Sequence, residues 1–367
     1  MSPGVEIQLV AALVAAACAL PGAFLVLRRM ALVSDAISHT VLLGIVVGFI
    51  IIPDLHSPVL IVAAALSGVL MVSLSELLLR TRRVKEDAAI GLVFPALFSI
   101  AVIIISRQFS GVHLDTDVVL LGELAFAPFN RATLLGVDLP RGVWVMGTIL
   151  LLNLILIAVF YKELKLSTFD AGLAVALGFS PALIQYGLMA VVSVTAVGAF
   201  DHVGSVLVVA LMIAPPAAAY LLTNSLSRML LLSVVIAVAA AITGYWAAHW
   251  LDVNIAGAMA GMTGVYFLAA LIFAPERGLI ARRLEQVRRR QRFAVEMLLV
   301  HLVSHENTAT EAAENSLSHL TEELNWSLNF AEETVRRASH QGLVERHDNR
   351  LALTLAGRQT AAQVLAR

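Results

Sequence analysis

Long apolar stretches recur along the first three quarters of the chain and decide what it can fold into. Each has about the ~20 residues that an α-helix needs to cross the ~30 Å core of a bilayer. We expect membrane helices at about 6–27, 31–52, 58–79, 88–106, 142–161, 181–200, 203–223, 229–250 and 255–274. Their number is eight or nine, because the chain from Phe200 to Gly204 either turns tightly or breaks one longer element. The stretch 118–135 is interrupted by polar residues and Pro128, which predicts short or re-entrant helices.

The charged residues are concentrated towards the end of the chain. Only 14% of all residues are charged, against roughly 25% in soluble domains. Residues 276–367 nevertheless hold 25 of the 51 Asp, Glu, Lys and Arg residues. We therefore expect a transmembrane domain at 1–275, a basic juxtamembrane linker at 276–292 and a small soluble domain at 293–367. The single cysteine, Cys18, excludes a disulfide framework and a thiolate zinc cluster within one chain.

Basic residues mark alternate loops between the apolar stretches. The loops that carry them begin near Arg28, Arg80, Lys162, Arg228 and Arg277. Because loops rich in Lys and Arg stay in the cytoplasm, we expect these loops and the C-terminal domain there, and the N-terminus outside. The other loops carry Asp and His side chains, which would attract a dication. Ordinary polar loops are the alternative interpretation.

Two ionisable residues lie deep in the second apolar stretch. A charged side chain at the centre of a membrane helix costs at least ~2.5–3.5 kcal/mol, so its presence calls for a reason. Asp35 and His39 are four residues apart and share one helix face. A carboxylate beside an imidazole is half of a site for manganese, zinc or iron, with further ligands from a second subunit or water. The alternative is a structural pair in which Asp35 bonds to His39 and to Ser34 and Ser38.

A second ionisable pair, Asp201 and His202, lies near a membrane boundary. Adjacent side chains on a helix diverge, so this pair is a poorer metal site than the first. We interpret it as an outer gate or a part of the ion pathway. Glu123 is a weaker candidate for the same pathway.

The segment after the fifth apolar stretch has the features of a docking surface. No GxxxxGK[ST] motif occurs in the sequence, so any ATP that powers transport is hydrolysed by another chain. That chain needs a cytoplasmic surface to bind. Here a basic edge leads to a capping aspartate, a short helix and a glycine stop. The predicted contact residues are Phe169, Asp170, Ala176, Leu177 and Gly178. A plain linker helix is the alternative.

Four sequence blocks, taken in order, carry a family resemblance. They are Arg29-Met-Ala-Leu-Val-Ser-Asp-Ala-Ile-Ser-His39, Glu86-Asp-Ala-Ala-Ile-Gly91, Phe160-Tyr-Lys-Glu-Leu164 with the Ala-Leu-Gly178 segment, and Val206-Leu-Val-Val-Ala-Leu-Met-Ile-Ala-Pro215. From about Leu25 to Phe273 the chain resembles the permeases of bacterial manganese, zinc and iron ABC importers. The family usually has Gly where Ser34 stands. Many members have an acidic residue or Gln followed by Ala where this chain has Asp201 and His202.

The resemblance implies an all-α polytopic fold related to the cobalamin importers, in a bacterial plasma (inner) membrane. It implies a transport subunit without catalytic residues or a permanently bound cofactor, which moves Mn²⁺, Zn²⁺ or Fe²⁺. Asp35 and His39 would contribute to the metal pathway, and the segment from Phe169 to Pro181 would couple to an ATPase. The implied partners are an ATP-binding subunit, a second permease copy or paralogue, and an extracytoplasmic metal-binding protein.

The soluble tail alternates helix and turn patterns. We expect helices at about 293–305, 316–325 and 330–341, then a short hairpin ending at Thr354 and a last helix. This order resembles a winged-helix domain of metal-responsive repressors of the diphtheria-toxin-repressor type. The resemblance favours manganese as the transported ion, by analogy only.

The sequence of the tail is compatible with several functions. Its charge is mixed, without a strong positive excess. DNA is one candidate partner, and the phosphate contacts would come from Arg336, Arg337 and Arg350. The alternatives are a protein-docking module and a metal-sensing module with His301, His305 and His319 as candidate ligands. For the whole chain, two other functions stay in view: a membrane-anchored metal-responsive regulator and an ion-driven secondary transporter.

Overall fold

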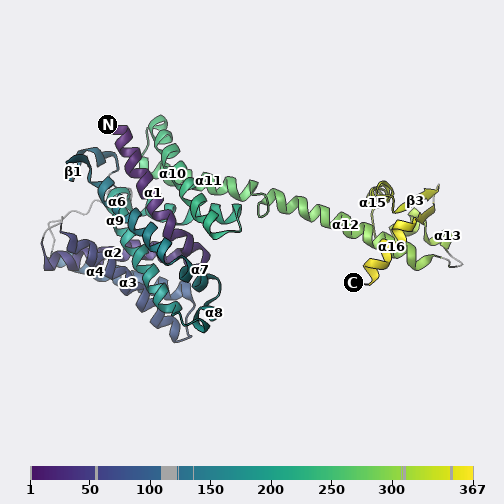
Figure 1. Cartoon of the computed structure of the whole chain (residues 1–367), viewed down its shortest axis with the longest axis horizontal. Helices are drawn as coiled ribbons and strands as arrows, with labels where there is room; N and C mark the ends of the chain where they lie inside the picture. The colour runs from purple at the N-terminus through teal and green to yellow at the C-terminus, as the bar shows by residue number, and fades with distance from the viewer. Residues whose placement is uncertain are drawn as a thin grey trace. The chain divides into compact units, whose positions relative to one another are not determined.

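The computed structural model describes residues 2–53, 57–108, 122, 124–134, 136–306, 308, 311–347 and 350–366. The chain forms two compact units, Met1–Gly278 and Leu279–Arg367 (Figure 1). Each unit buries its own cluster of hydrophobic residues, so each is stabilised by its own packing.

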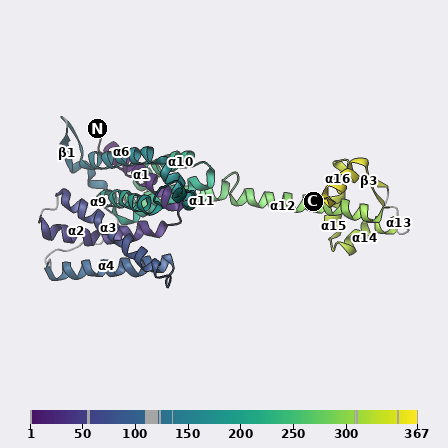
Figure 2. The ribbon, with the colours of Figure 1, turned by 60° about the horizontal axis from the view of Figure 1, so that its bottom comes forward.

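The first unit is a bundle of long helices. Within the described residues, eight are long and apolar enough to cross a membrane: α1 (Pro3–Leu27), α2 (Ala31–Ile51), α3 (Pro58–Arg80), α4 (Glu86–Gln108), α6 (Arg141–Val159), α9 (Pro181–Leu222), α10 (Leu226–Leu251) and α11 (Ile255–Phe273). The shorter elements are η1 (Leu124–Phe129), β1 (Arg131–Leu134), β2 (Val137–Pro140), α7 (Tyr161–Phe169) and α8 (Ala171–Ala176). Figure 2 shows α4 at the edge beside α2 and α3, with α9 and α1 beyond them.

The stretch 118–135 differs in part from the prediction of short helices. Leu124–Phe129 is a 3-10 helix, but Arg131 begins an antiparallel β-hairpin in which it lies opposite Pro140. The Arg131 guanidinium contacts Asp138 at 2.8 Å and Glu6 of α1 at 3.1 Å. These ion pairs tie the hairpin to the beginning of α1, and the apolar pattern gave no sign of them.

The core of the first unit is formed by α1 against α9. Small residues let the two backbones approach closely, as is common between membrane helices. A Cβ atom on Gly22 would lie 2.0 Å from the carbonyl oxygen of Met212. Asn153 of α6 is fully buried beside them, and its side-chain amide donates to the Ala17 carbonyl at 3.0 Å and to the Thr195 hydroxyl at 2.9 Å. The buried amide is therefore satisfied by both core helices.

The helix α9 reverses its direction at Gly204. A straight helix of its 42 residues would be ~63 Å long, about twice the bilayer core. Through Asn153, Thr195 lies at the level of Ala17 of α1. His202 and Val10 both lie against Gly142, and Met212 lies against Gly22. Along α9 the chain thus runs antiparallel to α1 before Gly204 and parallel to it afterwards. Gly204 permits this with φ 74° and ψ 168°. Of the two readings of the 200–204 stretch, the tight turn is the one observed.

Replacing Gly204 by alanine is expected to destabilise the first unit by about 1–3 kcal/mol, because L-residues disfavour this backbone conformation. The thermal midpoint of the detergent-solubilised protein, followed by size-exclusion chromatography, measures the loss. Gly187→Ala in the same element is the matched control, since nothing lies within 4 Å of its added methyl group. Equal thermal midpoints for the two variants would show that the turn at Gly204 does not require glycine.

The second unit begins with a long helix and ends with a compact set of short elements. They are α12 (Leu279–His305), α13 (Glu311–Glu314), α14 (Leu317–Glu323), α15 (Leu328–His340), β3 (Val344–His347), β4 (Arg350–Leu353) and α16 (Leu355–Leu365). β3 and β4 form an antiparallel hairpin in which Val344 lies opposite Leu353. Leu298, Leu320 and Val335, from three helices, are buried together in the core of the unit.

Most of the basic stretch 276–292, predicted as a juxtamembrane linker, is part of a long helix. From Leu279 it is helical and continuous with the first predicted helix of the tail, which makes α12 a single element. No Gly or Pro occurs between Leu279 and His305 to interrupt it, and Arg is a good helix former. Ion pairs four residues apart, Glu285 with Arg289 and Arg292 with Glu296, add support along the exposed face.

Candidate functional site

The structure brings Asp35 and His39 together on one face of α2. His39 Nε2 lies 3.6 Å from Asp35 Oδ1, and the side chains are 37% and 46% exposed, respectively. Two donors bound to one ion at ~2.1 Å with a tetrahedral angle would be ~3.4 Å apart. The pair therefore has nearly the spacing of two ligands of one ion, with an open side on which further ligands can bind.

Two phenylalanines of α4 border the pair, and the sequence patterns did not identify them. The His39 ring stacks on Phe94 with centroids 5.7 Å apart, and Phe98 contacts it edge-on at 6.1 Å. The rings fix the orientation of the imidazole and exclude water from one side. The only hint in the sequence was their spacing of four residues around Pro95.

The serines that we considered as partners of Asp35 bond elsewhere. The Ser34 hydroxyl donates to the sulfur of Met212 at 3.1 Å, and the Ser38 hydroxyl donates to the Ser34 carbonyl at 3.0 Å. Both serines are buried. The purely structural explanation of the pair thus loses two of its three expected contacts, and what is left is the contact between Asp35 and His39.

Asp201 and His202 lie at the turn of α9, away from the first pair. Ser193 of α9 and Ile37 of α2 both lie against Gly68 of α3. Ser193 is therefore at the level of Ile37, which is between Asp35 and His39 in the sequence. His202 is nine residues further along, about 13 Å at the rise of an α-helix. The structure therefore gives two separate pairs at different depths. Glu123, the third candidate, lies outside the described residues.

His202 is buried whereas Asp201 is exposed, so the two side chains point apart as expected. Within the described part of the chain, no hydrogen-bond partner reaches the buried Nε2 atom of His202. Its ring lies against Gly142 at the beginning of α6. A buried ring nitrogen of this kind calls for an explanation, such as a water molecule or an ion beside it.

The predicted docking segment forms α7, α8 and the turn after them. The Asp170 carboxylate accepts from the backbone N–H of Leu173 at 2.9 Å, so Asp170 caps α8 as predicted. Gly178 ends α8 with φ 85°, and the next residue, Phe179, donates to the Ala174 carbonyl. Phe169 and Leu177 are 61% and 60% exposed. The segment therefore presents exposed apolar side chains.

Arg28 at the end of α1 bonds to this segment, a contact that the sequence pattern did not indicate. Its guanidinium donates to the Ser167 hydroxyl at 2.7 Å and to the Thr168 hydroxyl at 3.2 Å. The core helix α1 is thereby connected to α7 beside the docking surface.

The three arginines considered for DNA differ in their surroundings. Arg336 on α15 and Arg350 on β4 are exposed. Arg337 contacts Glu333 at 3.5 Å and bonds to Gln291 of α12, so its guanidinium is used inside the unit. Two of the three arginines are therefore exposed, and the third is bonded within the unit.

Comparison with known proteins adds independent information. The model of the ABC 3 transport family matches residues 5–274. The zinc transport system membrane protein TroD of Treponema pallidum is 50% identical over 352 residues, 96% of each chain. The manganese transport system membrane protein MntD of Bacillus subtilis is 49% identical over 273 residues, 74% of this chain and 92% of that protein.

A solved structure shares the arrangement of the helices. PsaBC from Streptococcus pneumoniae in complex with Fab has a TM-score of 0.63 at 27% identity, covering 76% of this chain and 94% of that one. The 352-residue alignment with the Treponema protein is longer than the first unit and thus extends into the second.

Proposed function

The chain belongs to the ABC 3 transport family, and on this premise we propose that it is the membrane-spanning permease subunit of an ATP-binding-cassette importer for divalent transition-metal ions. The observation that carries the proposal is the Asp35–His39 contact of 3.6 Å in the first half of an apolar helix, with one side open. A carboxylate and an imidazole suit Mn²⁺, Zn²⁺ and Fe²⁺ alike. The half-site would be completed by water or by a second permease copy or paralogue.

The contacts at the helix ends support a topology with the N-terminus outside and the C-terminal unit in the cytoplasm. With the reversal in α9, the eight helices supply nine crossings, an odd number. Arg28 bonds to Ser167 of α7, and Arg277 donates to the carbonyl of Tyr220 at the end of α9. These arginines belong to the loops that the positive-inside rule assigns to the cytoplasm. The docking segment lies at the same end, where a cytoplasmic ATPase would bind.

The partners follow from the same premise. ATP hydrolysis belongs to a separate ATP-binding subunit, which would contact Phe169, Asp170, Ala176, Leu177 and Gly178. An extracytoplasmic metal-binding protein would deliver the ion to the outer end, where Asp201 and His202 act as a gate. The names of the relatives include zinc, manganese and iron transport. The preference for manganese therefore rests on the winged-helix analogy, which we retain as a prediction.

The proposal is tested by uptake of radiolabelled Mn²⁺ and Zn²⁺ into proteoliposomes that contain this chain and its ATP-binding subunit. We expect uptake that requires ATP, and competition between the two ions ranks them. Uptake that persists without ATP or the ATPase would favour a secondary transporter. Absence of uptake in every preparation, with an assembled complex, would favour the membrane-anchored regulator.

A further inference from the structure

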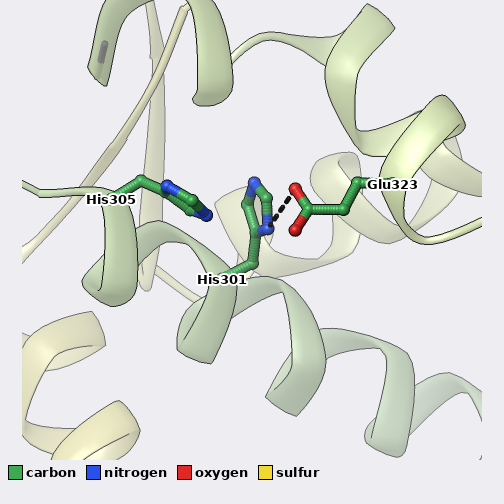
Figure 3. Close-up of side chains that lie close together, drawn as sticks. All are labelled: His301, His305 and Glu323. Atoms are coloured by element: carbon green, nitrogen blue, oxygen red, sulfur yellow. Dashed lines mark ion pairs between the residues drawn. The ribbon is translucent and has the colours of Figure 1, made fainter.

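Two histidines and a glutamate meet in the second unit, away from the membrane helices. His301 and His305 lie one turn apart on α12, and Glu323 lies at the end of α14. One ligand atom from each falls within 4.8 Å of the other two. Figure 3 shows both rings and the carboxylate turned toward a common point. Residues from two helices, 18 positions or more apart in the chain, are thus brought together by the fold.

Further ionisable groups surround these three. His319 Nε2 lies 2.8 Å from Glu323 Oε2, and the His305 ring pairs with the Glu314 carboxylate. The His301 and His305 ring centroids are 4.6 Å apart, and the His319 ring lies 5.8 Å from that of His301. Three imidazoles so close together would repel one another if all were protonated. They are compatible as neutral rings, the form that binds metal.

The hydrogen bonds of His301 leave one ring nitrogen facing the carboxylate. Its Nε2 atom lies 3.2 Å from the backbone carbonyl oxygen of Glu314, to which it can only donate. In the neutral ring, Nδ1 then carries a lone pair, and this atom lies 3.4 Å from Glu323 Oε2. A cation that lies between this lone pair and the carboxylate would be bound by both groups.

We propose that His301, His305 and Glu323 bind a divalent transition-metal ion, with His319 within reach as a further ligand. The separation of 3.4 Å between His301 Nδ1 and Glu323 Oε2 matches the ~3.4 Å expected for two ligands of a tetrahedral zinc ion. The bond from His301 to a backbone carbonyl is the usual support of a metal-bound imidazole. A surface pocket of about 400 Å³ borders the three residues and gives an ion access.

The donor set selects the class of ion. Two or three imidazole nitrogens with one carboxylate suit Zn²⁺ and its neighbours, whereas Mg²⁺ and Ca²⁺ prefer oxygen ligands alone. Such a donor set also binds Zn²⁺ more tightly than Mn²⁺. Because the site joins α12 to α14, its occupancy would stabilise the packing of the short helices on α12. The site is independent of Asp35 and His39, so it does not rest on the proposed transport function.

The test uses the full chain, purified in detergent without its ATPase and carrying Asp35→Ala and His39→Ala, so that the membrane pair does not contribute. After equilibrium dialysis against Zn²⁺, elemental analysis gives the metal bound per chain, and Co²⁺ absorption reports the coordination geometry. We expect one Zn²⁺ per chain and the intense visible bands of tetrahedral Co²⁺. His305→Ala and Glu323→Gln in this background should each lower Zn²⁺ affinity at least ten-fold and remove the bands.

His340→Ala, an exposed histidine on α15, is the matched control and should leave binding unchanged. Glu323→Gln preserves size and hydrogen bonding, so it separates loss of a ligand from loss of folding; size-exclusion elution checks the latter. Equal binding by Glu323→Gln, His305→Ala and the control would overturn the proposal. Absence of bound Zn²⁺ before these substitutions would overturn it equally. Neither outcome bears on the permease role, which is tested separately by uptake with Asp35 and His39 intact and the ATPase present.

Discussion

Replacing Asp35 by alanine is expected to abolish ATP-dependent metal uptake, with a loss of more than about 100-fold. Altering even a group that supports a metal ligand commonly costs 10–100-fold in affinity or activity, so loss of the ligand itself should cost more. The substitution removes the negative charge that offsets the cost of bringing a dication into the membrane. His39→Ala should lose a comparable amount, because the remaining carboxylate cannot replace the imidazole nitrogen. Uptake of labelled Mn²⁺ and Zn²⁺ into proteoliposomes at equal protein content measures both losses.

Two other polar residues of apolar helices serve as matched controls for this experiment. Glu76 of α3 contacts Arg80 near the end of its helix, and His249 of α10 packs edge-on against Trp246. Glu76→Gln and His249→Ala should keep uptake within about two-fold, because neither residue lies at the Asp35–His39 pair. Near-normal uptake in the Asp35 and His39 variants would mean that the pair is structural. The pathway would then be sought near His202.

The membrane helices could be predicted well, because the thickness of the bilayer fixes their length and leaves few alternatives. The Asp35–His39 contact was predictable for a similar reason, since residues four apart on a helix share a face. The direction of the chain after Phe200 was not predictable. It depends on the φ angle of Gly204, and a glycine accepts both signs of φ. The sequence restricted that region to two choices without deciding between them.

Contacts between distant segments were beyond the reach of sequence patterns. Phe94 stacks on His39, Arg28 bonds to Ser167, and Glu323 faces His301, each across at least 22 residues of chain. In each case one partner was noticed by its chemistry, and the other had no local feature that distinguished it. Such contacts are decided by packing, which fixes a geometry that composition and spacing leave open. For these contacts, the sequence therefore identified one of the two partners but not the other.

Replacing Leu177 by aspartate is expected to prevent assembly with the ATP-binding subunit and to reduce uptake at least ten-fold. The exposed apolar side chains around α8 include Phe169, Leu173, Val175 and Leu177, and a partner that covers them would bury the new carboxylate without a counter-charge. Burial of an unpaired charge costs several kcal/mol, enough to break a contact of this size. Co-purification of the ATPase with the tagged permease measures assembly.

Two control variants separate loss of the docking surface from a general effect of the substitution. Leu177→Met keeps the surface apolar and should assemble normally, whereas Val137→Asp places the same charge on a residue 49% exposed in the β-hairpin. In the proposed topology this hairpin is extracytoplasmic. Val137→Asp should bind the ATPase as wild type does. Binding of metal to the detergent-solubilised chain should be equal in all variants, since Asp35 and His39 are unchanged. If Leu177→Asp still assembles and transports, the exposed segment is a linker helix, and the apolar side chains of α8 are in contact with lipid rather than with a partner.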